Sequence, residues 1–452
     1  MNKIMYFLFI SIFTVEWVAA PRALSAVNVS GRIVAWTPDI LALVAMVLVM
    51  AVIAQRRELA LPFRYGMFLL AFLLITVGWA VVSGVSSGVL LAGMRSYLKY
   101  LPFFLLPLAY RFSETQIRRQ LLVLLGLSLL QLPVVLYQRF IQFADKRTGD
   151  VITGTLGGNA SGILSVYLAC AIAIVVAFYV KGRIGIKTVV PIVLLLALPM
   201  MLNETKISLL LLPAAIVGPA LIGRGDGSAS LTKAVAAVAI GAVIIGAFLP
   251  IYQALQGRDL VEFITNERKL QQYLAPGKNP QFEQVSNRFD SIDAAVRQLS
   301  RDGNLLLGVG IGNASLSFSE KLTGEYYKKH KNLAPGMVYL SRILWELGLV
   351  GVVVYGTLFL MMAIDCLHMR RRQELAGSLA LGWIIVSGFM AASFVYFKTF
   401  DVNLFGCLYW YFAGYLAGEL YRQRQRRLVE SRAKENEDTG DMNWTGAAGR
   451  SW

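Results

Sequence analysis

The sequence predicts an all-α polytopic membrane protein, with about 12 transmembrane helices and one long external loop that contains short helices. Two observations lead to this fold class. First, 56% of the 452 residues are hydrophobic and only 15% are charged, whereas soluble domains are about 25% charged. Second, long apolar runs alternate along the chain with short basic segments. Because about 20 apolar residues cross a bilayer, runs of this length predict spanning helices.

Counting the apolar runs gives twelve candidate spans. They are roughly 4–20, 36–54, 65–82, 89–110, 120–140, 159–180, 188–203, 206–222, 233–252, 336–365, 375–396 and 403–421. The first run, with Lys3 before it and small residues after it, also fits a cleaved signal peptide, which would leave eleven spans. Glu16 interrupts that run and favours a retained helix.

Basic residues occupy every second connection between these runs. The basic connections are 55–58, 111–119, 181–187, 223–233, 368–374 and 422–427. Lys and Arg are enriched in cytoplasmic loops, so twelve spans with both termini in the cytoplasm place all of them inside. The net charge of +16 is thereby assigned to membrane topology, and no nucleic-acid partner is expected.

The predicted organisation has four parts. Residues 1–252 hold helices 1–9, 253–335 form a large external loop, 336–421 hold helices 10–12, and 422–452 form a basic, then polar tail that we expect to be disordered. Within the loop, an amphipathic helix is predicted because apolar residues recur with a period of 3.6. These are Val285, Phe289, Ile292, Val296 and Leu299. The glycine-punctuated segment 305–313 follows it.

Two cations inside the run 89–110 are the first candidate site. Arg95 and Lys99 are four residues apart, so they share one face of a helix. Each charge at mid-membrane costs about 2.5–3.5 kcal/mol or more. The run contains no acidic residue, which suggests that an anionic substrate is their counter-ion. The alternative is that both side chains reach toward the membrane interface.

Three further segments carry candidate residues. Glu204 and Lys206 separate two apolar runs. Lys206 would bind an anion, and Glu204 would orient Lys206 or hold an acceptor hydroxyl. The alternative is that both side chains are solvated in a hairpin. The glycines of 154–162 expose amides at a helix start or serve helix packing. His330 lies among lysines that favour its neutral form, which can act as a general base, although a solvated loop histidine fits equally.

No metal or other cofactor is expected from the sequence. There is no DxD pair, no Walker motif and no HExxH or GxSxG motif. Two histidines and three cysteines without pairing or metal-binding spacing cannot form a zinc site.

Five segments together resemble the O-antigen polymerase/ligase superfamily of integral-membrane glycosyltransferases, including exopolysaccharide polymerases. They are GMRSYLKY (93–100), GTLGGNASG (154–162), NETKISLLLLP (203–213), NRFDSIDAAVRQLSRDGNLLLGVGIGN (287–313) and VYLSRILWELGLVG (338–351). The resemblance implies a GT-C-like fold in a bacterial inner membrane, with the long loop periplasmic. It also implies metal-independent transfer of sugars from a polyprenyl diphosphate. By this similarity Arg95, Lys206 and Arg288 contact the diphosphate, with Lys99 close by.

One departure from the family affects the predicted general base. Members often carry His-Asn directly before Tyr-Leu, but Met337-Val338 precede Tyr339-Leu340 here, and His330 is seven residues upstream of the expected place. This favours a polymerase of lipid-linked repeat units over an O-antigen ligase. A lipid-linked oligosaccharide transporter and a non-enzymatic scaffold are the alternatives from other classes. The expected partners are the polyprenyl-diphosphate-linked oligosaccharide, the bilayer and other polysaccharide-assembly proteins.

Overall fold

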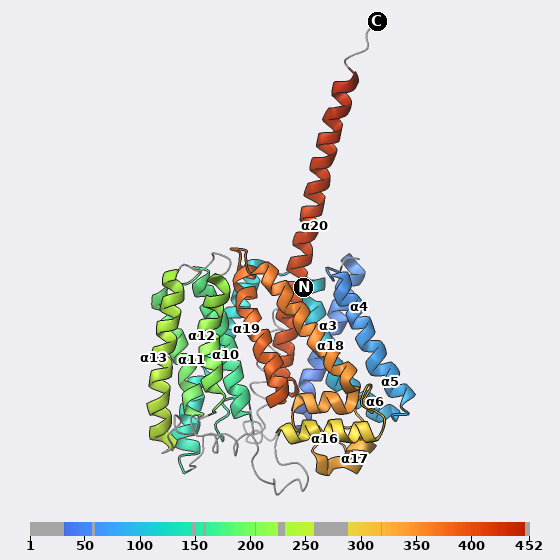
Figure 1. Ribbon diagram of the computed structural model, residues 1–452, viewed down its shortest axis with the longest axis vertical. Helices are drawn as coiled ribbons and strands as arrows, with labels where there is room; N and C mark the ends of the chain where they lie inside the picture. The colour runs from blue at the N-terminus through green and yellow to red at the C-terminus, as the bar shows by residue number, and fades with distance from the viewer. Residues whose placement is uncertain are drawn as a thin grey trace.

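The computed structural model describes residues 31–56, 59–145, 151–156, 160–203, 205–224, 231–256, 288–317 and 319–447. All regular elements in these residues are helical (Figure 1). The bundle helices are α3 (Gly31–Arg56), α4 (Phe63–Leu73), η1 (Leu74–Gly78), α5 (Trp79–Val82), α6 (Ser87–Leu98), α7 (Leu101–Ala109), α8 (Glu114–Leu129), α9 (Gln131–Tyr137), η2 (Gln138–Gln142), α10 (Ser161–Val180), α11 (Ile186–Leu202), α12 (Ser208–Arg224), α13 (Leu231–Gln256), α18 (Tyr339–Met369), α19 (Leu375–Tyr396) and α20 (Asn403–Ala447). The short elements of the loops are α16 (Arg288–Arg301), η4 (Glu320–Leu322), α17 (Glu325–His330), η5 (Lys331–Leu333) and η6 (Thr399–Asp401).

The membrane class is supported, whereas the count of twelve spans is not established. A helix occupies each predicted position from residue 36 onward, and the first run, 4–20, lies outside the described residues. Within the described part, seven helices are long and apolar enough to cross a membrane. They are Pro38–Gln55, Phe63–Val82, Glu114–Gln142, Ser161–Val180, Leu231–Pro250, Tyr339–Met369 and Leu375–Tyr396. The predicted span 89–110 is a pair of helices, α6 and α7, bent by 47°, and α11 and α12 have only 17 residues each.

Helix α20 connects the two sides of the bundle. On one side α10 packs against α11, α12 and α19; on the other side α7 packs against α3 and α20 (Figure 1). Glycine permits the closest of these contacts: a β-carbon on Gly414 of α20 would lie 2.1 Å from the Phe104 carbonyl oxygen of α7. Small residues are the usual means of close helix packing in membranes.

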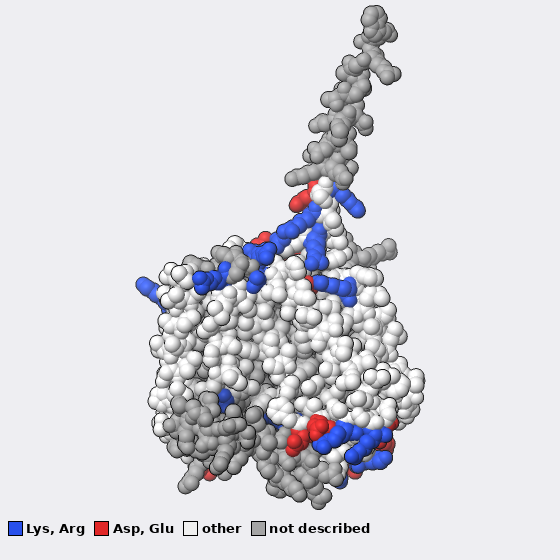
Figure 2. Space-filling model, in the orientation of Figure 1, with Lys and Arg blue, Asp and Glu red and all other residues white. Residues whose placement is uncertain are grey.

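Charges mark the two ends of the bundle. Figure 2 shows Lys and Arg gathered where α20 leaves the bundle, and mixed acidic and basic residues at the opposite end. We call the first end the basic face; it is formed by residues 110–113, 181–185 and 370–374 and by α20 at Arg422. These segments are tied together, since Arg183 donates to the carbonyl of Gln373 and Arg422 donates to that of Pro107. On the face that Figure 2 shows, the surface between the ends is almost free of charge, as a bilayer requires.

The C-terminal tail differs from the expectation of disorder. Helix α20 continues without a break for 45 residues, through Ala447, and extends away from the basic face (Figure 1). At about 1.5 Å per residue it is longer than a bilayer is thick. The physical reason is local: residues 419–439 contain no Gly or Pro and are rich in Arg, Gln and Glu, which are good helix formers.

Candidate functional site

Helix α18 is interrupted at Gly348, where φ is 63° and ψ is −158°. The glycine-punctuated loop 305–310 fills the interruption and satisfies the backbone groups that the break releases. Four hydrogen bonds of 2.9–3.1 Å do this. Before the break, the Trp345 carbonyl accepts from the Val309 amide and the Glu346 carbonyl accepts from the Gly310 amide. After the break, the Leu349 amide donates to the Leu305 carbonyl and the Val350 amide donates to the Leu306 carbonyl. A broken helix is tolerated at membrane depth only when its backbone groups are paired in this way. The first part of α18, residues 339–347, is therefore free to take its own direction.

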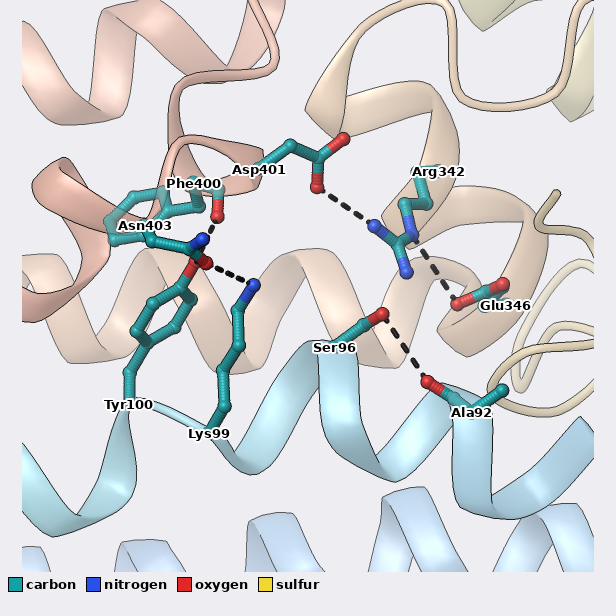
Figure 3. Close-up of polar contacts among 9 residues, drawn as sticks. All are labelled: Ala92, Ser96, Lys99, Tyr100, Arg342, Glu346, Phe400, Asp401 and Asn403. Carbon is teal, nitrogen blue, oxygen red and sulfur yellow. Dashed lines mark hydrogen bonds and ion pairs between the residues drawn. The ribbon is translucent and has the colours of Figure 1, made fainter. Parts of the chain in front are cut away.

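The bend between α6 and α7 lies opposite the start of α20 (Figure 3). The Tyr100 hydroxyl donates to the Phe400 carbonyl at 2.6 Å. Lys99 donates to Oδ1 of Asn403, and its Nζ lies 4.9 Å from the centroid of the Tyr100 ring. Lys99, which is predicted to face a substrate anion, is thus held by polar and aromatic groups of the protein itself.

A small polar cavity of about 90 Å³ lies between α6, the loop after Gly310 and the first part of α18. We call it the arginine pocket. Its lining residues are Ala92, Gly93, Arg95, Ser96, Gly312, Ser315, Leu316, Ser317, Leu322 and Arg342. Two guanidinium groups and three serines in one cavity are a suitable lining for a phosphate-type anion, because Arg matches phosphate oxygens with two donors at once.

Arg342 is fixed in the pocket wall by two carboxylates (Figure 3). Its Nη1 lies 2.9 Å from Oδ1 of Asp401, and its Nε lies 3.7 Å from Oε2 of Glu346. The Arg342 side chain is 12% exposed and Glu346 is fully buried, whereas Asp401 is 40% exposed. The guanidinium also lies 5.3 Å from the centroid of the Tyr97 ring. Asp401 is therefore the partner that an incoming anion can replace.

The expectation that the substrate is the counter-ion of Arg95 needs correction. Arg95 makes a bidentate ion pair with Asp39 of α3. The distances are 2.8 Å from Nε to Oδ1 and 2.6 Å from Nη2 to Oδ2. The run 89–110 contains no acid, but packing brings one from a helix that begins 64 residues before Arg95. The two arginines of the pocket thus face three carboxylates: Arg95 pairs with Asp39, and Arg342 pairs with Glu346 and Asp401.

The other predicted anion contacts do not line this pocket. Lys206 lies half-buried in the turn between α11 and α12, and Glu204 lies outside the described residues. Arg288 is the first residue of α16, and its guanidinium stacks over the Tyr396 ring at 3.8 Å. Of the six predicted site residues, the pocket lining includes Arg95 only. Among the described residues, no three His, Cys, Asp or Glu are grouped as a metal site.

His330, the predicted general base, is packed among aromatic rings at the end of α17. Its ring centroid lies 4.5 Å from that of Tyr326 and 6.0 Å from that of Trp345. Its Nε2 is buried, with no hydrogen-bond partner among the described residues. Burial lowers the pKa of His330, Lys329 lowers it further, and Asp302 opposes the shift. This shift favours the neutral imidazole. His330 belongs to the contact between α17 and α18 and does not line the pocket.

We expect His330→Phe to leave the arginine pocket intact and to change only the pH dependence of stability. The folded-state pKa of His330 is below its unfolded value of about 6.5, so its contribution is complete above that pH and is lost as the pH falls through the folded pKa. Melting temperatures from pH 5 to 8 should show a smaller acid loss in the variant. The same acid loss of stability in the variant and the wild type would contradict the burial of His330 among these rings.

Two residues of the site are not among the predicted ones. Arg342 is a cation inside the apolar run 336–365, so the rule that selected Arg95 and Lys99 also selects it. Glu346 follows it by one helical turn and is buried beside it.

No protein-family model matches this chain, and no curated protein sequence matches it. The geometry of the pocket is therefore the basis on which a function can be assigned.

Proposed function

We propose that the chain polymerises polyprenyl-diphosphate-linked oligosaccharide repeat units, and that the arginine pocket receives the diphosphate. The observation that supports this most is the pair of guanidiniums, Arg95 and Arg342, beside three serines in one cavity. Helix α6, which lines this cavity, lies at the end of the bundle opposite the extension of α20 (Figure 1). Lys and Arg are enriched in cytoplasmic loops, so in this proposal the basic face is cytoplasmic and the pocket faces the periplasm.

The proposed reaction is an inverting, metal-independent glycosyl transfer. The oxygen of an acceptor hydroxyl bonds to the anomeric carbon of the donor sugar, and the bond from that carbon to the phosphate oxygen breaks. The diphosphate leaves with the electron pair, and the hydroxyl proton passes to a carboxylate base, for which Glu204, the residue expected to hold the acceptor hydroxyl, is the candidate; His330 does not line the pocket. Arg95 and Arg342 stabilise the negative charge that grows on the leaving group. Such electrostatic stabilisation by fixed donors is usually the largest single contribution to the rate enhancement of an enzyme.

The carboxylates around the pocket fit this role. An anion that enters would exchange with Asp401, whose side chain is 40% exposed and is free to turn to water. Glu346 and Asp39 stay in place and hold the two guanidiniums in position before the substrate arrives. Groups that are positioned in advance need no reorganisation during the reaction.

A mutant cycle on Arg95 and Asp39 tests the pocket directly. Arg95→Ala should lower polymer formation about 10- to 100-fold, the cost of one charge-assisted contact, while the protein level stays normal. Asp39→Ala removes the carboxylate of this ion pair and should lower stability. In the double variant, stability should recover in part relative to Asp39→Ala, but polymer formation should stay as low as in Arg95→Ala because the substrate contact is still missing. Wild-type polymer from the double variant would mean that Arg95 serves only the ion pair.

The activity itself is tested in a strain that lacks the protein, by sizing lipid-linked and surface glycans. Single repeat units that accumulate on polyprenyl diphosphate, without long polymer, are the expected result. Normal long polymer that stays on the lipid carrier would identify a ligase. Unchanged glycans would favour the transporter or scaffold alternatives.

A further inference from the structure

A second, larger cavity lies between α8, α10, α11, α19 and the first turns of α20, and it shares no lining residue with the arginine pocket. Its volume is about 350 Å³. Most of its wall is aliphatic or aromatic, as shown by Leu121, Ile174, Ile192 and Phe412. Its charged lining residues are Glu114, Arg118 and Arg183; Arg183 belongs to the basic face, and Glu114, which directly follows segment 110–113 of that face, lies 3.8 Å from it. The cavity therefore has one charged end and an apolar body.

The lining of α8 shows this polarity within one helix. The residues that line the cavity follow a single stripe with helical spacing, namely Glu114, Arg118, Leu121, Leu122, Leu124, Leu125 and Ser128. The charged residues lie in its first turns and the leucines follow.

The cavity is long enough to hold part of a lipid chain. On α19 the lining runs from Leu375 to Met390, which are 15 residues apart. At about 1.5 Å per residue this is roughly 20 Å, more than half the thickness of a hydrocarbon core of about 30 Å.

The charged end favours an anion. Arg183 lies 3.8 Å from Glu114, which leaves Arg118 as the additional positive charge; it has no ion-pair partner among the described residues. Helix α11 begins at the same end, its first turn has no side-chain cap, and Thr188 of that turn lines the cavity. Uncapped amides at a helix start attract anions. The cations and the helix start thus act on the same end of one cavity.

The cavity is also open toward the bilayer. Leu122, which lines the cavity, is 57% exposed, and it lies in Glu114–Gln142, a stretch long and apolar enough to cross a membrane. The apolar body is therefore accessible from one leaflet, next to the charged end. A free inorganic anion would use only that end and would leave the apolar body empty.

We infer that this cavity binds an anionic phospholipid of the leaflet at the basic face. Its phosphate lies at Arg118, Arg183 and the start of α11, and one acyl chain fills the apolar body. Because this site is at the end opposite the arginine pocket, the lipid is a bound component of the protein and not the sugar donor.

Lipid retention by the full-length protein tests the inference. Wild type, Arg118→Ala and Arg119→Ala are purified in detergent with phosphatidylglycerol or phosphatidylcholine added, and bound lipid is measured by native mass spectrometry. Arg119 is the matched control, since it is exposed on the same helix but does not line the cavity. We expect wild type and Arg119→Ala to retain phosphatidylglycerol over phosphatidylcholine. In Arg118→Ala, the ratio of retained phosphatidylglycerol to retained phosphatidylcholine should fall about tenfold, which is the effect expected for the loss of one charge-assisted contact.

A second variant tests the cavity body and covers the case in which Arg118→Ala fails to fold. Ala171→Phe places a ring into the lining of α10 and should reduce retention of either phospholipid while the arginines stay in place. Equal retention of the two phospholipids by wild type, or unchanged retention in both variants, would overturn the inference. Polyprenyl phosphate that displaces phosphatidylglycerol from wild type would also overturn it, because the occupant would then be the carrier lipid.

Discussion

Arg342→Ala should reduce polymer formation by at least about 100-fold, the size of effect seen when one fixed donor to a developing anion is removed. It should also lower stability, because it leaves the fully buried Glu346 and the neighbouring Asp401 without their cation. Breaking one side of a buried pair costs about 3–5 kcal/mol. Polymer length in a complemented null strain and the melting temperature of the purified protein measure the two effects separately.

Two controls separate the charge of Arg342 from its shape. Arg342→Lys keeps a positive charge between the carboxylates, so its stability should match that of wild type. Lys cannot make a bidentate phosphate contact, so the variant should retain only part of the wild-type activity. Arg301→Ala removes an exposed arginine at the end of α16, outside the pocket, and should behave as wild type. Full activity in stable Arg342→Ala protein would exclude the pocket as the diphosphate site.

Gly93→Ala should be nearly as damaging, although it adds one methyl group. A β-carbon at Gly93 would lie 2.7 Å from the amide nitrogen of Gly312 and 2.7–2.8 Å from the carbonyl carbon and oxygen of Ile311. These are backbone atoms, so the loop has to move away from α6. That loop forms one wall of the arginine pocket. Overpacking of this kind costs about 1–3 kcal/mol, and a displacement of about 1 Å at a site lowers activity about 100-fold.

Gly126→Ala is the matched control for Gly93→Ala. Gly126 lies inside α8, and a β-carbon there would have nothing within 4 Å. The same substitution should raise stability slightly, by up to about 1 kcal/mol, because Ala is the better helix former. Polymer formation should not change. Equal activity of the two variants would show that the contact between α6 and the loop is not needed to shape the pocket.

The positions of the helices could be predicted from the sequence because they depend on local composition. Apolar length and basic connections depend on neighbouring residues only, so the helices from residue 36 onward and the basic face agree with the structure. The amphipathic helix of the loop was also predicted: α16 buries Ala295 and Leu299. Phe289, placed on the same apolar stripe, is 49% exposed, because α18 covers only part of that stripe.

The partners of the charges could not be predicted in this way. Arg95 stands in a run without acids, and only the packing of α3 against α7 brings Asp39 to it. Lys99 meets Asn403 across 304 residues. Arg342 carries the same local signal as Arg95, yet its position in the pocket depends on the break at Gly348 and on the loop that fills it.

The sequence by itself thus determined the membrane class, the helix positions, the basic face and the presence of costly cations inside apolar runs. The tertiary structure decided which cations meet in one pocket and which carboxylates hold them. The physical reason is range: hydrophobic periodicity and membrane cost act on each segment alone, whereas an ion pair depends on the distance between segments that only packing sets.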